Sequence, residues 1–517
     1  MKNHHVKASS SFGSVPSRPL VSNDRSSRTA DSSVQSSLRI SSLMKTPIFI
    51  SSIVTVLLTA ALAHVNAEDI TVDFAAKLQP WHGFGVNYVE TAQTRDYDKW
   101  PQDFGGFSKL TESQRHEFMN ALYGPDGLGL SLHKIFLDPW AQATPDAPYD
   151  FERTTQWSRW FLREAMKRTT RQDRTLRVIT TLYGPPAWAT KQKKLLARDF
   201  DPAQADALAR YMAAWVGFLE EKEGVQAEFL SLSNEAKDAG FFTDDGMGPK
   251  GNSDYNLAWK DSEMTDMMKR MHALLPDVGF TPTEPTGWDG ANYFPFMKTQ
   301  ELRDALGIIT AHSFGRSDQW GPDFVKKALA QKRGLPVWTT SHDWRKGGVD
   351  FAQHTHAQIY KVGVNGIITW QVSKNLSEWR PAPKNPNAAI MQQKDGGLAL
   401  AQPYYFLKQM SLAGQPGMSV VDAVSENKDV RAMAFASNGT KHPDAIVIIN
   451  ASDEEQVCAL AVSGTDAKTW KARRTTESGE HFIELPPLSE LSAIQLPQRG
   501  VLTLFANSPR ISPLKND

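Results

Sequence analysis

The chain has 517 residues, of which 57 are Lys or Arg, 57 are Asp or Glu, and one is Cys. This length is enough for one large domain and a smaller one. The balanced charge excludes the basic bias of a nucleic-acid-binding protein and gives no sign of attraction to an anionic membrane surface. Cys458 has no partner for an intrachain disulfide, and its alternating apolar neighbours predict a buried structural thiol.

The first 67 residues precede the region with regular secondary-structure patterns. Residues 1–43 are rich in Ser and Arg without hydrophobic periodicity, which predicts a disordered extension or sequence upstream of the true translation start. A lysine, an apolar run over residues 47–63 and small residues up to Ala67 then predict a signal peptide at 44–67. The mature protein is therefore expected to be secreted or periplasmic and free of the membrane. An uncleaved membrane anchor is the alternative.

Strand-like and helix-like segments alternate over residues 81–372. A capping box at Thr111 and Gln114 begins one helix, and Asp201 followed by Pro202 marks the start of another. Eight βα units of this length predict an α/β fold, a closed (β/α)8 TIM barrel over residues 81–400. The strands are predicted at residues 82–86, 130–137, 177–182, 227–233, 278–282, 308–312, 336–340 and 366–371.

After Pro416 the pattern changes to short strands separated by turn residues. This pattern is typical of an all-β sandwich, which we predict over residues 401–508 and before a tail at 509–517. A strand within residues 68–80 precedes the barrel and is expected to join the sandwich. The sandwich strands are predicted at residues 430–435, 445–449, 456–462 and 501–505.

Several motifs in this order resemble glycoside hydrolase family 30, which has a TIM barrel fused to a side β-sandwich. The likeness runs from about residue 70 to residue 505, and the order of the motifs is more specific than any one of them. The motifs are Gly83-Phe84-Gly85, Gly184-Pro185-Pro186-Ala187-Trp188, Asn234-Glu235, His312-Ser313-Phe314, Trp370-Gln371, Tyr404-Tyr405 with Pro416-Gly417, and the closing segment 496–503.

The resemblance implies a hydrolase that acts on a β-linked polysaccharide or oligosaccharide. Glu235 matches the family's general acid/base, which protonates the departing glycosidic oxygen. Asn234 is expected to bind a neighbouring sugar hydroxyl, and His312 to bind substrate or orient a carboxylate. Trp188 and Trp370 are expected to line a sugar cleft, although most tryptophans in such a chain pack in the core. Glu284, after the fifth barrel strand, is a further candidate to bind a sugar hydroxyl.

The main departure from the family lies at the end of the seventh barrel strand. The family's W-x-T/S-E reads Trp338-Thr339-Thr340-Ser341 here, and the usual second-strand arginine is replaced by Lys134. Ser341 is neutral, so it serves at most as a substrate contact and cannot balance the charge of an oxocarbenium ion. Loss of the neighbouring anion is also expected to lower the pKa of Glu235.

Asp343 is the predicted substitute for the missing carboxylate. It lies two residues beyond Ser341 and shares its face of the strand, about 6.5 Å further along, while His342 points away. Inverting glycosidases hold their carboxylates about 6.5–9.5 Å apart, so the hypothesis is inversion with Asp343 as the base. The alternative is that Asp343 caps the next helix or pairs with Arg345.

Two classes of function therefore remain open: a hydrolase, and a catalytically inactive carbohydrate-binding protein on the same fold. Ser341 favours the second class, whereas Glu235 and the tryptophans fit both. The sequence has no Gly-rich phosphate loop, so no cofactor is expected. No metal is expected either, because His82, His133 and His312 lie on different strands without a short ligand spacing.

Overall fold

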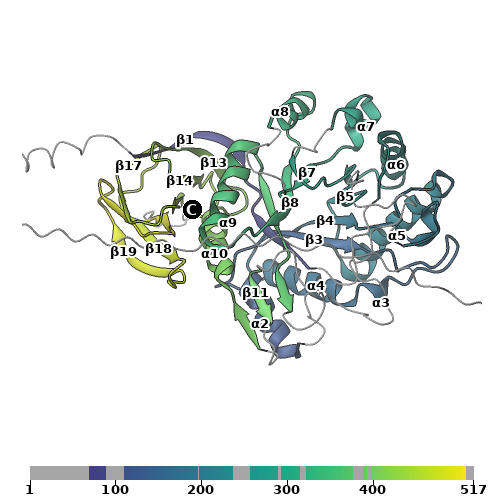
Figure 1. The fold of residues 1–517 in the computed structure, drawn as a ribbon, viewed down its shortest axis with the longest axis horizontal. Coiled ribbons are helices and arrows are strands. Elements are labelled where there is room, and N and C mark those ends of the chain that lie inside the picture. Colours follow the sequence, from purple (N-terminus) through teal and green to yellow (C-terminus); the bar gives the residue numbers. More distant parts are fainter. Residues whose placement is uncertain are drawn as a thin grey trace, which may run out of the picture. The chain divides into compact units, whose positions relative to one another are not determined.

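The computed structural model describes residues 69–88, 110–195, 197–236, 257–288, 293–314, 322–375, 388–392 and 397–507. The predicted N-terminal extension and signal peptide lie outside these residues. The described part combines an eight-stranded parallel sheet with a second eight-stranded sheet. Figure 1 draws both as ribbons. Among the helices described, none is both long and apolar enough to cross a bilayer.

The parallel sheet has the strand order β6-β5-β4-β3-β2-β9-β8-β7. Its two end strands meet, because Phe280 forms a parallel bridge with Leu306 and its carbonyl accepts a hydrogen bond from Gly307 N at 2.9 Å. A Cβ on Gly307 would lie 2.3 Å from Gly279 Cα, so this close approach requires glycine. The sheet therefore closes, which confirms the predicted TIM barrel. Its strands are β2 (Phe84–Asn87), β3 (Leu132–Leu137), β4 (Arg177–Leu182), β5 (Phe229–Ser231), β6 (Gly279–Thr281), β7 (Ile309–His312), β8 (Val337–Asp343) and β9 (Gly366–Trp370).

Helices follow the barrel strands, and their starts show how the local sequence sets them. The predicted capping box is present: Thr111 Oγ1 accepts from Gln114 N at 3.3 Å, and Gln114 Oε1 accepts from Thr111 N at 2.9 Å. Asp201 caps the 3-10 turn at Pro202–Gln204, and the helix proper begins at Ala205. The helices are α2 (Glu112–Tyr123), α3 (Phe151–Thr154), α4 (Gln156–Thr170), α5 (Ala205–Glu223), α6 (Asp261–Leu274), α7 (Gln300–Ala305), α8 (Pro322–Gln331), α9 (Gly348–Ala357) and α10 (Gln402–Ala413).

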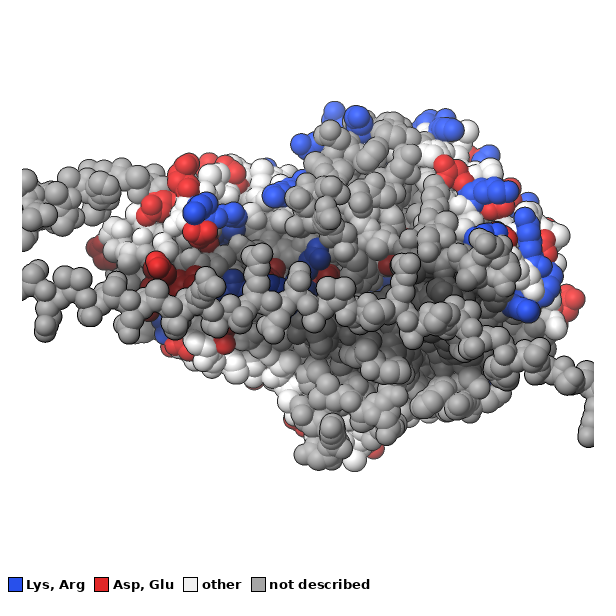
Figure 2. Space-filling view, viewed as in Figure 1, with Lys and Arg blue, Asp and Glu red and all other residues white. Residues whose placement is uncertain are grey.

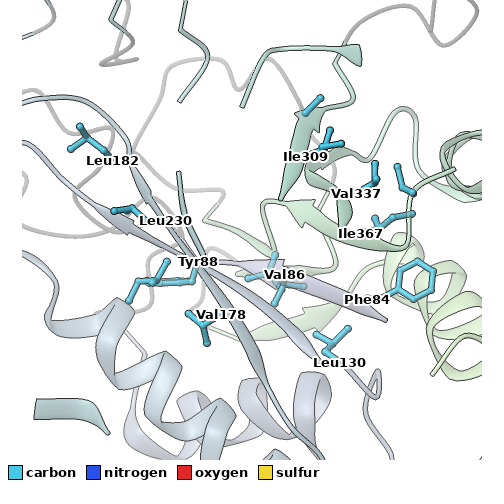
Figure 3. Close-up of a cluster of buried hydrophobic side chains, with 14 of the residues drawn as sticks. Phe84, Val86, Tyr88, Leu130, Val178, Leu182, Leu230, Ile309, Val337 and Ile367 are labelled. Carbon is cyan, nitrogen blue, oxygen red and sulfur yellow. The ribbon is translucent and has the colours of Figure 1, made fainter. Parts of the chain in front are cut away.

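The barrel wall has two apolar faces, because successive residues of a strand point to opposite sides. One face packs against the helices, and Figure 3 shows part of this layer. The inner face carries a separate apolar cluster that fills the barrel. The side chains labelled in Figure 3 include Phe84, Val86, Val178, Leu230, Ile309, Val337 and Ile367, and the inner cluster is Leu132, Ile179, Phe229, Ile308, Trp338 and Ile368.

The second sheet has the order β17-β1-β13-β14-β15-β21-β18-β19, and strands β16 and β20 form a small sheet beside it. The N-terminal strand β1 pairs with β13 and β17, and Cys458 is buried in the apolar cluster of this all-β part. Burial raises the pKa of the Cys458 thiol to about 11. The strands are β1 (Ile70–Pro80), β13 (Ser419–Ser425), β14 (Val430–Ala436), β15 (Ala445–Asn450), β16 (Gln456–Cys458), β17 (Leu460–Ser463), β18 (Trp470–Thr476), β19 (Ile483–Leu488), β20 (Ile494–Leu496) and β21 (Gly500–Ala506).

The all-β part and the barrel share contacts, and the predicted limits between them stay predictions. Helix α10 lies inside the range 401–508, yet five of its buried apolar residues belong to the same core cluster as the barrel helices: Tyr404, Phe406, Leu407, Met410 and Ala413. A third small sheet joins β10 (Ser373–Asn375), β11 (Ile390–Gln392) and β12 (Leu398–Leu400). On the described part of the surface in Figure 2, acidic and basic side chains lie among one another, as the balanced composition leads us to expect.

Candidate active site

Glu235 lies just beyond the C-terminal end of β5, the face where TIM barrels carry their active sites. Its backbone has a φ of 42°, a left-handed conformation that is uncommon outside glycine. The neighbouring segment holds it there: Glu235 N donates to Glu284 O, and Glu284 N donates to Ser233 O, each at 3.0 Å. Strain of this kind costs about 1–3 kcal/mol and is often found at functional sites. The Glu235 side chain is 14% exposed.

His312, the last residue of β7, lies between two carboxyl groups. Its Nδ1 is 2.9 Å from Glu235 Oε1, and its Nε2 is 3.7 Å from Glu284 Oε2. The first distance is a hydrogen bond and the second is a longer electrostatic contact. The backbone of His312 is fixed by its own bond to Pro285 O at 2.8 Å. The structure thus brings together three of the predicted site residues in one direct chain of contacts.

Glu284 has no exposed surface, and both of its carboxyl oxygens have partners within the protein. Lys134 Nζ donates to Oε2, and Thr181 Oγ1 donates to Oε1, each at 2.6 Å. Burial alone would raise the pKa of Glu284, but the Lys134 ammonium and His312 outweigh it and hold this pKa well below its usual range. Burial lowers the pKa of Lys134, and the Glu284 carboxylate opposes that shift. Lys134 and Glu284 therefore form a buried ion pair.

Ser341 lies on β8, where the pairing with β7 contains a bulge. The register passes from Ala311 opposite Thr339 to His312 opposite Ser341, which leaves Thr340 unpaired in the ladder. Ser341 is buried, and its Oγ has no hydrogen-bond partner among the described residues. The place where the family carries a second glutamate therefore presents a neutral hydroxyl at the level of His312.

His342 and Asp343 are the last two residues of β8, and their side chains have different surroundings. The Asp343 carboxylate accepts from Arg345 N at 3.0 Å and lies 3.3 Å from Arg345 Nη1, and its side chain is 17% exposed. The His342 ring contacts Ser313 Oγ and Thr355 Oγ1 at 2.9 and 3.0 Å. Asp343 thus pairs with Arg345, which was the alternative in the sequence analysis.

The two tryptophans predicted to line the cleft lie in different places. Trp370 is half-buried, pairs with Asp343 in the β8–β9 ladder, and has its ring 6.1 Å from that of Phe136. Trp188 is buried; its Nε1 donates to Gln142 O at 3.2 Å and its ring meets Tyr211 edge-on. Asn234 is buried, and its backbone forms an isolated parallel β-bridge with Glu284. Sugar contacts by these residues, and by His312, Ser341 and Glu284, stay predictions.

The histidines considered as metal ligands have separate partners. His82 Nδ1 accepts from Trp338 Nε1 at 3.0 Å, and His133 Nδ1 lies 3.3 Å from Tyr123 OH. Within the described ranges, no group of three or more His, Cys, Asp or Glu residues is arranged to hold a metal ion.

The Lys134–Glu284 pair is the part of the site that sequence reasoning missed. From the sequence, Lys134 stands out only as a replacement for the family's arginine. The signal was present, because Lys134 lies two residues after Leu132 on β3 and so shares its inward face. A lysine buried there requires a buried anion. A carboxylate at a strand end, such as Glu284, was the available partner.

Comparisons with known proteins identify the fold of this chain through solved structures. Neither the scan of protein-family models nor the search of curated proteins finds a match. Among solved structures, the family 30 subfamily 8 xylanase of Clostridium acetobutylicum matches with a TM-score of 0.64 and 19% identity, over 86% of this chain and 100% of that one. The family 30 endoxylanase of Clostridium papyrosolvens gives 0.62 and 18%, over 85% and 100%. An endo-β1,6-glucanase gives 0.60 and 14%, over 86% and 95%.

The chain has the fold of glycoside hydrolase family 30. This bears out the resemblance stated from the sequence motifs, including the second sheet beside the barrel. The likeness to these enzymes is one of fold, so the chemistry of this chain has to be argued from its own residues.

Proposed function

We propose that this chain is a secreted glycoside hydrolase that acts on a β-linked glycan, with Glu235 as its general acid. The observation that carries the proposal is the Glu235 carboxyl group, partly exposed at a barrel strand end and hydrogen-bonded to His312. A glycosidic oxygen is a poor leaving group and needs a carboxylic acid to protonate it as the bond breaks. The xylanases and the β1,6-glucanase of the same fold support a β-linked substrate.

We assign Asp343 as the carboxylate that assists from the other side. Ser341 carries no charge, and both oxygens of Glu284 are occupied by Lys134 and Thr181. Asp343 keeps exposed surface, and its contact with Arg345 favours the ionised form that a base requires. In the proposed reaction Glu235 gives its proton to the leaving oxygen, water bonds to the anomeric carbon from the opposite face, and Asp343 takes the water's proton. The product then has the inverted configuration.

The first test compares the wild type with Glu235→Gln on a panel of β-linked xylans, glucans and galactans. The amide keeps the shape of the side chain but cannot donate the acid proton, so turnover should fall about 10²-fold or more. Glu301→Gln, an exposed glutamate of α7, is the matched control and should leave turnover unchanged. Equal rates for the wild type and Glu235→Gln would contradict the assignment.

The configuration of the first product tests the role of Asp343. Proton NMR during the first minutes of hydrolysis, before mutarotation, should show the α-anomer from a β-linked substrate. A β-anomer would mean retention and would remove Asp343 as the base of an inverting reaction.

A carbohydrate-binding protein without turnover is the second candidate, favoured by Ser341 and by the Asp343–Arg345 pair. It predicts equal and negligible turnover for the wild type and Glu235→Gln, with binding to the same glycan in isothermal titration calorimetry. Secretion rests on the predicted signal peptide at 44–67. This signal peptide predicts that N-terminal sequencing of the exported protein will find its first residue near Glu68.

A further inference from the structure

We propose that Glu284 and Lys134 are positioning residues that set the tautomer of His312 and thereby keep the acid proton on Glu235. The inference rests on the proposed function, since it explains how Glu235 stays a proton donor without the usual second glutamate. Its basis is the continuous chain of contacts from Lys134 through Glu284 and His312 to Glu235.

The first step is that Glu284 is an anion. Two donors, Lys134 Nζ and Thr181 Oγ1, reach its two oxygens at 2.6 Å, and neither member of the ion pair has exposed surface. Hydrogen bonds and a nearby cation both favour the charged form of a carboxyl group. An ionised carboxylate only accepts hydrogen bonds, so Glu284 presents negative charge to whatever lies beside it.

The second step concerns the ring of His312. Its Nε2 is the nitrogen that faces Glu284 Oε2, at 3.7 Å. A nitrogen lone pair facing this oxygen is repelled, whereas an N–H group is attracted, so the proton belongs on Nε2. In a neutral imidazole one nitrogen donates and the other accepts, and Nδ1 is then left as the acceptor.

The third step gives the state of Glu235. Its Oε1 is 2.9 Å from Nδ1, a hydrogen-bond distance. If Nδ1 has only a lone pair to offer, the hydrogen in this bond must come from the carboxyl group. Glu235 is therefore held as a carboxylic acid, which is the form that protonates a leaving group. In this arrangement Glu284 supplies, through His312, the influence that a neighbouring nucleophile would supply directly.

Two further charged groups described at this end of the barrel, Lys134 and Asp343, are in ion pairs. From β3, Lys134 would by itself favour the ionised form of Glu235, but its charge is balanced by Glu284 at 2.6 Å. From β8, the charge of Asp343 is balanced by Arg345. His312 from β7 contacts Glu235 directly. Of these described groups, His312 is the one that shares a hydrogen bond with Glu235, so its tautomer acts directly on the proton.

The test reads the tautomer directly by ¹⁵N NMR of the full chain labelled at histidine, with His312→Asn to assign the signal. In the wild type at neutral pH we expect His312 to carry its proton on Nε2 and none on Nδ1. Since Glu284→Gln alone would leave Lys134 buried without a counterion, the main variant is Lys134→Met with Glu284→Gln, checked for folding by circular dichroism. It should shift His312 toward the Nδ1–H form, and Glu301→Gln should not.

Three results would overturn the inference: an Nδ1–H tautomer or a doubly protonated ring in the wild type, or an unchanged tautomer in the folded double variant. These readouts do not require turnover, so they stand even if no glycan is hydrolysed and the proposed function fails. Where turnover is found, the basic limb of the kcat/KM profile should move to lower pH by about one unit in the double variant. A limb that stays in place while activity falls would point to a merely structural role.

Discussion

Two sides of the barrel mouth treat their polar side chains differently. On the side built by β3 to β7, five polar side chains form one chain of contacts, in which the ion pair lies next to the proposed acid and the only link longer than a hydrogen bond is the 3.7 Å contact of His312 Nε2 with Glu284. On the side built by β2 and β8, three buried polar side chains have atoms without a hydrogen-bond partner among the described residues. The first group is Lys134, Thr181, Glu284, His312 and Glu235; the second is Asn87, Thr340 and Ser341.

The difference indicates that the fold supports the proton donor and not a second carboxylate at the usual position. A buried polar group left unpaired costs about 1–3 kcal/mol, so the β8 side is adapted to meet water or a ligand group at Ser341. On the β5–β7 side, the carboxyl groups of Glu235 and Glu284 both have hydrogen-bond partners within the protein. The proton donor is thus supported by its surroundings, whereas nothing at Ser341 supplies negative charge. This asymmetry accounts for an altered reaction better than for an unaltered retaining one.

The largest expected effect comes from breaking the Lys134–Glu284 ion pair on the β3–β7 side of the barrel mouth. Lys134→Met leaves the Glu284 carboxylate buried without its cation, and we expect a loss of about 3–5 kcal/mol in the free energy of unfolding. Urea denaturation followed by circular dichroism measures it. Lys134→Met with Glu284→Leu removes both charges and should recover most of the loss. A double variant as unstable as the single one would show that packing, and not the unpaired charge, is responsible.

The second expected effect comes from adding a negative charge on β8, at Ser341. Ser341→Glu should restore an anion at the level of His312 and raise turnover about 10²-fold, because charge stabilisation of that order is typical of one well-placed group. The first product should then retain the anomeric configuration. Ser341→Gln is the matched control and should stay at the wild-type rate. An equal gain for both variants would mean that side-chain size, and not charge, is what the site lacks.

Much of the fold follows from local patterns, and the site follows from them only in part. The strand Arg177–Leu182 lies where its apolar run predicted it, and the capping box at Thr111 begins its helix as expected. The predicted strand 456–462 is instead divided at Ala459, because its halves pair with different partners, β20 and β1. Such partners lie far away in the sequence and leave no local signal.

The same reasoning applies to the candidate site. The Asn-Glu motif after a predicted strand points to Glu235, and alternation along the next-to-last barrel strand points to Asp343, whereas the bulge at Thr340 depends on how β8 pairs with β7. The bond between Lys134 and Glu284 joins residues that are 150 positions apart. A single sequence shows that each needs a partner without showing that they are partners of each other.

The smallest effect separates the two faces of one strand. His133 precedes Lys134 on β3 but faces outward, stacks on Phe161 and has no partner for its Nε2 among the described residues. Burial lowers its pKa to about 3, whereas an unfolded histidine has a pKa near 6.5. The unfolded chain therefore binds the proton first as the pH falls, and the folded state loses stability between about pH 6.5 and pH 3.

His133→Phe should reduce this acid sensitivity by at most about 1.4 kcal/mol per pH unit, measured as the free energy of unfolding at pH 7 and pH 5. His116→Phe serves as the control, because His116 is half-exposed and lies near Glu112 and Glu164. If His133→Phe left the pH dependence unchanged, the imidazole would take up its proton in the folded state. The outer face of β3 would then tolerate charge as the inner face does at Lys134, where Glu284 is present to balance it.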